Sequence, residues 1–380
     1  MKISLFSSPP GQIRHVFSLT MLFSVFILLL PDARAMDNSP FGLHPDVPSE
    51  QPEEGTFTFQ VYLKDSDMNL LSGGSLRFHD GSWHTVSETS TGTFEVNTNT
   101  ASVTLEMTYN NGRQTVGGHA SADDFTYQTT TTTLAIRDSD EALQSGGTGR
   151  YHQIGWVNWN SAANTDIELL PGQYTFEATI NNGRQTKVLT VPAGPAYEAG
   201  FHTVTTTLAI RDSDGATLSG GTGRYHQITW ADWNSEANTD IELLPGQYTF
   251  EATINNGRQT KVLTVPDGDP AFEATFNTVT TTLAIKDSDG VPQSGGTGRY
   301  HQITWANWNS EANTDIELLP GQYTFEATIN NGRQTKVVTV PAGPAFEVAF
   351  NTVTTTLAIK DSDGVPQSGG TGRYHQITWA

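Results

Sequence analysis

The sequence predicts an all-β protein built as a tandem array of antiparallel β-sandwich repeats of about 74 residues. The run Thr-Thr-Leu-Ala-Ile, followed by Arg or Lys and then Asp-Ser-Asp, has its first Asp at positions 138, 212, 287 and 361. A fixed period of this kind indicates the architectural unit directly. Within each period, short stretches alternate apolar and polar side chains, and no segment has the helical period.

The period divides the chain into repeats at 57–130, 131–204, 205–279, 280–353 and 354–380, of which the first is a diverged copy. The last repeat stops about a third of the way through. We therefore expect a fragment of a longer chain, because a sandwich that ended there would leave strands unpaired. Residues 36–56 are rich in Pro and Glu, which predicts a disordered leader.

One repeat contains six or seven short strands, which is the pattern of a β-sandwich. The expected strands of the third repeat are Val204 to Arg211, Thr222 to Trp230, Asp240 to Leu244, Gln247 to Ile254, Thr260 to Val265 and Ala271 to Asn277. Asn256-Gly257 favours a type I′ hairpin turn. With strands of about ten residues, each repeat adds about 30–40 Å, and five repeats would make a rod on the order of 150 Å.

The N-terminus has the features of a secretory signal. Lys2 and Arg14 precede an apolar stretch from Val16 to Leu30, and Ala33-Arg34-Ala35 has the form cut by signal peptidases. A membrane anchor is the alternative, but the apolar run is short and Pro31 follows it at once. We expect residues 1–35 to be cleaved, leaving a secreted or cell-surface protein with no membrane insertion.

Composition restricts the possible partners. The formal charge is −20, from 20 basic and 40 acidic residues. No basic cluster follows the signal, which disfavours nucleic acid as a partner. The chain has no cysteine, so each repeat must be stable without disulfides.

Tryptophan is the main candidate for ligand binding. Each complete later repeat carries Arg-Tyr-His and two tryptophans, whereas the diverged repeat keeps Trp83 and has Val86 at the second position. We interpret the position that stays Trp as core and expect the second tryptophan to be an exposed, multivalent glycan platform. That set is Trp159, Trp233 and Trp308. In the alternative interpretation, both tryptophans fill the core.

Acidic turns suggest calcium as the cofactor that the repeats could bind. The candidate ligands come in pairs, one per repeat: Asp138 and Asp140, Asp212 and Asp214, Asp287 and Asp289. Ca²⁺ takes six to eight oxygen ligands, so Asp240 and Glu242 would have to join them. The alternative is that tight turns accept Asp and Gly. Each repeat has one Arg-Tyr-His histidine and no second histidine at a ligand spacing, which disfavours zinc.

The repeats carry no motif of a catalytic site. The metalloprotease pattern His-Glu-x-x-His, the hydrolase pattern Gly-x-Ser-x-Gly and the phosphate-binding loop are all missing from the sequence. Glu251 falls on a solvent-facing register without an identifiable partner carboxylate. We therefore expect the repeats not to be an enzyme.

Two motifs carry a family resemblance. The stretch from Lys286 to Gly296, with Asp-Ser-Asp-Gly, and the stretch Leu318 to Glu326, with Leu-Leu-Pro-Gly-Gln-Tyr, resemble the carboxypeptidase-regulatory-like and Cna-B-like repeats of bacterial surface proteins. The resemblance implies a transthyretin-like (prealbumin-like), immunoglobulin-type sandwich that serves as a spacer or adhesive module.

The same resemblance raises the question of cross-links. Cna-B-like domains often join Lys and Asn of the first and last strands by an isopeptide bond. The candidate positions here are Lys64, Arg137, Arg211, Lys286 and Lys360. Arginine cannot form that bond, and the partner position is Asn277 or Asn351 but His202 in another repeat, so we expect no such cross-link.

These observations favour a stalk or adhesin-type rod that spaces or presents another module. Two alternatives stay open: a multivalent carbohydrate-binding repeat protein, and the accessory region of a secreted hydrolase.

Overall fold

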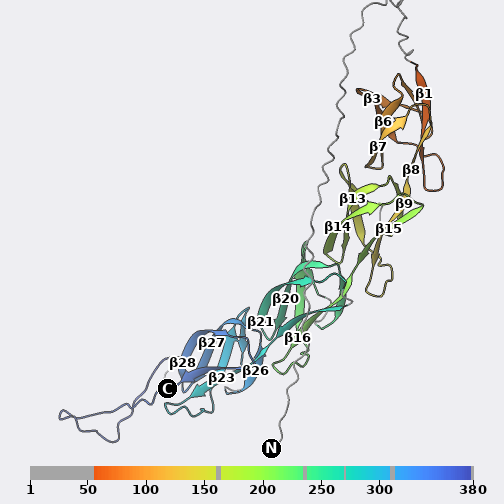
Figure 1. Cartoon of the computed structure of the whole chain (residues 1–380). Helices are drawn as coiled ribbons and strands as arrows, with labels where there is room; N and C mark the ends of the chain where they lie inside the picture. The colour runs from red at the N-terminus through yellow and green to blue at the C-terminus, as the bar shows by residue number, and fades with distance from the viewer. Residues whose placement is uncertain (1–54, 160–163, 234–237, 269–270, 309–312, 378–380) are drawn as a thin grey trace, which may run out of the picture. The chain divides into compact units, whose positions relative to one another are not determined.

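The computed structural model describes residues 55–159, 164–233, 238–268, 271–308 and 313–377. The predicted signal at 1–35 and nearly all of the predicted leader at 36–56 lie outside these residues. In the described ranges, no helix is long and apolar enough to span a bilayer. This part of the chain is all-β and forms four repeating sandwich units, which confirms the predicted fold class (Figure 1).

The strands fall into four sets that we call units 1 to 4. Unit 1 contains β1 (Phe57–Lys64), β2 (Ser75–His79), β3 (Trp83–Val86), β4 (Glu88–Ser90), β5 (Thr93–Thr98), β6 (Ser102–Tyr109), β7 (Gly112–Ala120) and β8 (Phe125–Gln128). Unit 2 contains β9 (Thr130–Arg137), β10 (Thr148–His152), β11 (Trp156–Asn158), β12 (Asp166–Leu169), β13 (Gly172–Ile180), β14 (Gly183–Val191) and β15 (Ala196–His202).

Units 3 and 4 repeat the seven strands of unit 2. Unit 3 contains β16 (Val204–Arg211), β17 (Thr222–His226), β18 (Trp230–Asp232), β19 (Asp240–Leu243), β20 (Gly246–Ile254), β21 (Gly257–Val265) and β22 (Ala271–Asn277). Unit 4 contains β23 (Val279–Lys286), β24 (Thr297–His301), β25 (Trp305–Asn307), β26 (Asp315–Leu318), β27 (Gly321–Ile329), β28 (Gly332–Val340) and β29 (Ala345–Asn351).

Each unit pairs two sheets. In unit 3 the sheets have the strand orders β19-β16-β22 and β18-β17-β20-β21, and units 2 and 4 have the same arrangement. The strand predicted from Thr222 to Trp230 is in fact two strands, because the chain reverses after His226 and β18 pairs antiparallel with β17. This reversal makes the three-residue strand β18 one edge of the four-stranded sheet.

The first and last strands of each unit run parallel, a pairing that the sequence did not indicate. In unit 2, β15 lies beside β9 with Ala196 opposite Thr131 and His202 opposite Arg137. The amide of Thr203 then donates to the carbonyl of Arg137 at 2.8 Å, and β16 begins at the next residue. The parallel pair therefore carries the chain from one end of a unit to the other before the next unit starts.

Ion pairs join these parallel strands in units 2, 3 and 4. Arg137 binds Glu198 through two hydrogen bonds, of 3.1 and 2.8 Å, and the Lys286 Nζ lies 2.7 Å from Glu347 Oε1. Lys286 and Asn351, the candidate positions for an isopeptide bond, are register partners on β23 and β29. The Lys286 ammonium is thus engaged in an ion pair with Glu347, which lies four residues before Asn351 on β29.

These ion pairs predict acid sensitivity. The hydrogen bond from Arg137 lowers the pKa of Glu198, and hydrogen bonds from Arg211 and Thr275 lower the pKa of Glu273, below the ordinary value of 4.5. A carboxyl whose folded-state pKa is lowered contributes stability above its ordinary pKa, and that stability is lost as the pH falls through the folded-state value. We expect the melting temperature to decrease when the pH is lowered below about 4.5. The decrease should be smaller in a Glu198→Gln/Glu273→Gln variant, and an identical pH profile in that variant would contradict the assignment.

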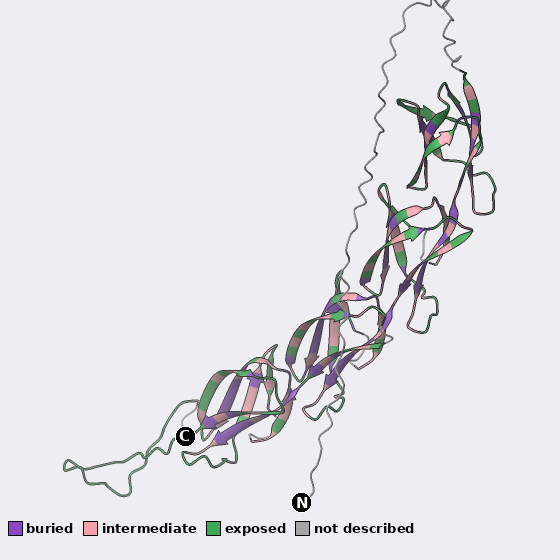
Figure 2. Ribbon diagram, in the orientation of Figure 1, coloured by how far each residue is buried: buried purple, intermediate pink, exposed green. Residues whose placement is uncertain are grey.

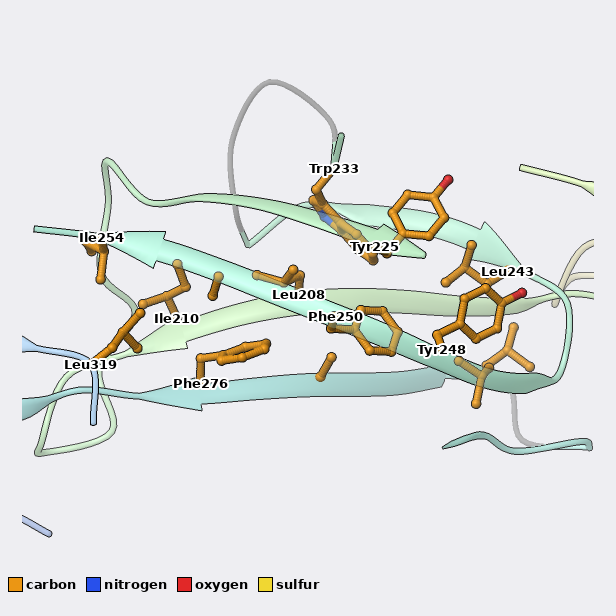
Figure 3. Close-up of a cluster of buried hydrophobic side chains, with 14 residues drawn as sticks. Leu208, Ile210, Tyr225, Trp233, Leu243, Tyr248, Phe250, Ile254, Phe276 and Leu319 are labelled. Atoms are coloured by element: carbon orange, nitrogen blue, oxygen red, sulfur yellow. The ribbon is translucent and has the colours of Figure 1, made fainter. Parts of the chain in front are cut away.

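Each unit has its own hydrophobic core between the two sheets, and the buried residues alternate with exposed ones along the strands (Figure 2). Figure 3 shows the core of unit 3, where Tyr225, Trp233, Tyr248, Phe250 and Phe276 meet between β17, β20 and β22. Large aromatic side chains supply much of the buried area, which lets a unit of this size fold without disulfides.

The hairpin between β20 and β21 is present but is shifted by one residue from the predicted turn. Asn255 and Asn256 have φ of 46° and 56°, while Ile254 pairs with Gly257 at the end of the ladder. The left-handed pair of the turn is therefore Asn-Asn, and Gly257 is the first residue of β21. Gly257 is therefore not needed for the turn itself, and its lack of a side chain instead makes room for the next unit.

Candidate functional site

Each junction between units is built around a leucine that enters the core of the preceding unit. Leu319 lies just after β26 of unit 4, yet it packs in the core of unit 3 beside Ile210 and Ile254 (Figure 3). Leu170 and Leu244 occupy the same place in the cores of units 1 and 2. All three leucines are fully buried. The second leucine of each Leu-Leu-Pro-Gly run therefore completes its neighbour's core.

The inserted leucine determines how deeply one isoleucine of the receiving unit is buried. Ile180 and Ile254, at the ends of β13 and β20, are buried in units that receive a leucine from the next unit. Ile329 holds the same position in unit 4, which receives no such leucine among the described residues, and it is only partly buried. The inserted leucine thus closes one end of the sandwich.

A repeated set of hydrogen bonds surrounds the leucine. At the junction between units 2 and 3, the Tyr225 hydroxyl donates to the carbonyl of Asn181 at 2.9 Å, and the Asn181 side chain donates to the carbonyl of Glu242 at 2.8 Å. The amide of Arg184 donates to the side-chain oxygen of Gln227. The same bonds recur at the junctions on either side. The Asn-Asn-Gly-Arg hairpin is therefore a docking element for the next unit.

The glycine of this hairpin allows the units to approach closely. A Cβ on Gly257 would lie 2.2 Å from the hydroxyl oxygen of Tyr323, and a Cβ on Gly183 would lie 2.1 Å from that of Tyr248. Real Cβ atoms do not approach so near, and Tyr323 is held in place because its hydroxyl donates to the carbonyl of Leu319 at 2.8 Å. Glycine is required there for contact between units rather than for turn geometry.

On the three-stranded sheet, a glutamate joins two units. Glu317 accepts hydrogen bonds from Thr278 and from Thr280, the latter at 2.5 Å, and Ser213 of unit 3 lies 3.4 Å from it. Glu168 and Glu242 make equivalent contacts. Glu242, considered as a calcium ligand, thus binds the hydroxyls of Thr203, Thr205 and Ser139.

The start of the fifth repeat makes two of the same contacts. Residues 352–377 contain no named strand, but the Tyr374 hydroxyl donates to the carbonyl of Asn330 at 2.7 Å. Gln376 accepts from the amide of Arg333 at 2.6 Å and donates to its carbonyl at 2.9 Å. The junction contacts are therefore encoded in the Arg-Tyr-His-Gln segment itself.

The prediction that Trp159, Trp233 and Trp308 are exposed is wrong. Trp233 is 1% exposed, and its indole N–H donates to the carbonyl of Thr239 at 2.9 Å. Trp159 and Trp308 are equally buried and make the corresponding bonds to Thr165 and Thr314. In this position the indole lies between the sheets, so its ring face is not available as a stacking platform for a sugar ring.

The other tryptophan of each pair is the exposed one. Trp83, Trp156, Trp230 and Trp305 are 44–45% exposed on the outer face of the four-stranded sheets. The cause is strand register: Tyr225 points into the core, so its neighbours Arg224 and His226 point outward. Trp230 is the cross-strand partner of His226 and shares its face.

The exposed tryptophan belongs to a cluster that recurs in all four units. In unit 3 the Arg224 guanidinium lies 4.4 Å from the centre of the Trp230 ring, and the rings of His226 and Trp230 are 5.3 Å apart. The distances in units 1, 2 and 4 agree to within 0.1 Å. We call this arrangement the Arg-Trp-His cluster.

A buried glutamate anchors the arginine of each cluster. Glu251 is 7% exposed and accepts two hydrogen bonds from Arg224, of 2.8 and 3.1 Å, with Arg258 at 3.3 Å on its other side. The bond to Glu251 raises the pKa of Arg224. Bidentate pairs of this kind fix the orientation of the guanidinium. The sequence placed Glu251 on a solvent-facing register, but the two arginines cover it.

An open groove lies beside the cluster. In unit 2 its volume is about 630 Å³, and in unit 4 it is about 390 Å³. The groove of unit 2 is lined by Thr148, Gly149, Arg150, Asn158, Trp159, Glu177 and Thr179, and that of unit 4 by the seven equivalent residues. Arg150 and Arg299 are thus shared between groove and cluster. The groove is polar and lies against the outer face of the sheet.

The first aspartate of each acidic turn shapes the turn. Asp212 Oδ1 accepts from the amides of Asp214 and Ala216 at 3.0 and 2.7 Å, and Asp138 and Asp287 make the same contacts in their turns. These are the contacts through which Asp stabilises tight turns. Within the described ranges, no group of three or more His, Cys, Asp or Glu side chains is placed to hold a metal ion.

Sequence reasoning missed the inserted leucines and selected the wrong tryptophan of each pair. The available signal was Trp83, which the diverged unit keeps where Val86 replaces the buried tryptophan. A core position can be refilled by other apolar side chains, so its replacement is compatible with burial. The leucines gave no signal, because Leu318 and Leu319 are adjacent and equally apolar.

Comparison with known proteins finds no family model and no curated protein that matches the chain. Among solved structures, the Bacillus anthracis TIE protein is 12% identical, covering 79% of this chain and 68% of that chain, with a TM-score of 0.19. A streptococcal ancillary pilin is 8% identical over 58% of this chain and 98% of its own, with a TM-score of 0.17. The pilus adhesin SpaC of Lactobacillus rhamnosus GG, in its open conformation, is 8% identical over 80% of this chain and 56% of its own, with a TM-score of 0.22. At these identities and TM-scores, the similarities carry no argument about function.

Proposed function

We propose that this chain is an extracellular structural repeat protein, a stalk that holds another module away from a bacterial surface. The observation that carries the proposal is the junction, in which a leucine of one unit completes the core of the preceding unit. Units joined by flexible linkers would have independent cores. Shared cores and repeated hydrogen bonds oppose bending between neighbours, as a spacer requires.

The parallel terminal strands support the same function. A stretching force along the chain acts on unit 2 at the start of β9 and at the end of β15. Because these strands are parallel partners from Thr131 to Arg137, the force loads their hydrogen bonds along the strands, and these bonds must fail together. The ion pair between Arg137 and Glu198 crosses the same pair of strands. The predicted signal at 1–35 favours placement outside the cell.

Distances between spin labels test this proposal. The chain has no cysteine, so cysteines introduced at Val188, Val262 and Val337, exposed on equivalent edge strands, can be labelled in pairs. We expect narrow distance distributions, with about 30–40 Å for each neighbouring pair and about twice that between positions 188 and 337. Pulsed electron–electron double resonance on the full chain measures these distances.

The matched variant is Leu244→Ala/Leu319→Ala in the same labelled chains, and it should broaden the distributions. Broad distributions in the parent chain would contradict the proposal, because they would mean that the units move independently. Narrow distributions that the leucine substitutions leave unchanged would assign rigidity to something other than the junction.

A further inference from the structure

The outer face of the four-stranded sheet holds features that a spacer does not need. An exposed tryptophan stands there in each unit, at Trp83, Trp156, Trp230 and Trp305. In units 2 and 4 an open polar groove adjoins it, and the arginine that lies against the indole also lines the groove. This arginine therefore connects the exposed indole to the groove in these units.

Packing does not account for this tryptophan. It is exposed at nearly the same fraction in all four units, and an exposed cation–π contact contributes about 0.5–1 kcal/mol. Unit 1 has lost the buried tryptophan, where it has Val86, yet it keeps Trp83 with Arg77 at 4.4 Å and His79 at 5.2 Å. The exposed position is thus retained where the core position has changed.

We propose that this face binds a neutral carbohydrate, with the exposed tryptophan as the stacking platform and the groove as the site for hydroxyl groups. The indole offers an apolar surface to the apolar face of a sugar ring. Asn158 and Arg150 supply polar groups beside it, and Thr148 and Thr179 line the groove. The groove volumes fall within the range of about 300–1,000 Å³ that is typical of small-molecule sites.

Charge favours a neutral ligand over an acidic one. Arg150 is engaged by Glu177 through bonds of 2.7 and 3.0 Å, so its charge is compensated. The chain carries a formal charge of −20, which repels acidic polymers. Asp232 of unit 3 is equivalent to Asn158 of unit 2 and adds a further negative charge opposite Arg224. A sugar that offers hydroxyl groups alone matches this surface.

Repetition of the site along the chain would allow multivalent binding. One shallow site of this kind binds weakly, but copies on a single chain raise the apparent affinity for a polymeric ligand without new contacts. The proposal goes beyond the spacer function and does not depend on it: the sheet face that carries the tryptophan is separate from the inserted leucines.

Binding of the full chain to a printed array of neutral and acidic oligosaccharides tests the proposal. We expect retention of neutral glycans and at least about tenfold weaker apparent affinity when Trp83, Trp156, Trp230 and Trp305 are all replaced by alanine. The control is Val188→Ala/Val262→Ala/Val337→Ala, which removes exposed apolar side chains from the opposite edge of the same sheets. It should bind as the parent does.

A second readout separates binding from folding. A retained oligosaccharide should protect the exposed tryptophans from acrylamide quenching, and circular dichroism should show that the alanine variant is folded. The proposal is overturned if no neutral glycan is retained, if only acidic glycans are retained, or if the tryptophan variant binds as the parent does. Self-association that depends on the tryptophans, without glycan retention, would instead make this face a contact between copies. The spin-label distances would be unaffected by any of these results.

Discussion

Replacing Trp233 by alanine is expected to lower the free energy of unfolding of unit 3 by about 3–5 kcal/mol. Trp233 is buried between the sheets, with its ring centroid 5.5 Å from that of Tyr225 and 6.1 Å from that of Phe250. Its removal leaves a cavity that the two rings cannot fill and removes the hydrogen bond from its N–H to the carbonyl of Thr239. Native-state hydrogen exchange measures the loss in peptides that contain Ala216–Leu218, a stretch found only in unit 3.

The matched control is Trp230→Ala, three residues away. Trp230 is 44% exposed and its ring contacts are with Arg224 and His226, so the expected loss is about 1 kcal/mol or less. Equal losses in the two variants would contradict the assignment of one tryptophan to the core and the other to the surface. Of the two variants, only Trp230→Ala removes one of the four exposed tryptophans of the proposed glycan sites.

Replacing Leu319 by alanine is expected to destabilise unit 3 rather than unit 4, in whose repeat it stands. Leu319 is fully buried in the core of unit 3, so the substitution should cost that unit about 2–5 kcal/mol. Exchange should rise in the peptides that contain Ala216–Leu218 and should rise less in those that contain Trp305–Trp308 of unit 4. In unit 4, where the described residues insert no such leucine, Ile329 is only partly buried, and we expect Ile254 to become similarly exposed in the Leu319→Ala variant.

The neighbouring leucine provides the comparison for this experiment. Leu318 is buried in the core of unit 4, so Leu318→Ala should destabilise unit 4 first. The two substitutions remove the same atoms from adjacent positions, and only the identity of the affected unit differs. If Leu319→Ala left unit 3 unchanged, or acted on unit 4 as strongly as Leu318→Ala does, the shared core would be refuted.

Much of the fold was predictable because its signals are local. The alternation of Val204, Thr206, Leu208 and Ile210 predicted a strand with one buried face, and the structure has β16 from Val204 to Arg211. The Asn-Asn-Gly hairpin was also predicted, although its left-handed residues are Asn255 and Asn256. Both features depend on side chains and backbone angles within a few residues of one another.

The candidate site was less predictable because it depends on which strands pair and in which register. Two tryptophans three residues apart must face opposite ways if both continue a strand, but their spacing does not say which one faces inward. The pairing of His226 with Trp230 beside the buried Tyr225 decides it. Likewise, only contact between units distinguishes Leu319 from Leu318.

The sequence alone determined the all-β class, the period of about 74 residues and most strand positions, because periodicity and turn residues act over short distances along the chain. The tertiary structure decided three features that join distant residues: the parallel pairing of first and last strands, the leucine shared between neighbouring cores, and the tryptophan that faces solvent. The physical reason is that burial and strand register are properties of the packed sheets. Identical side chains therefore take opposite roles according to the surface they meet.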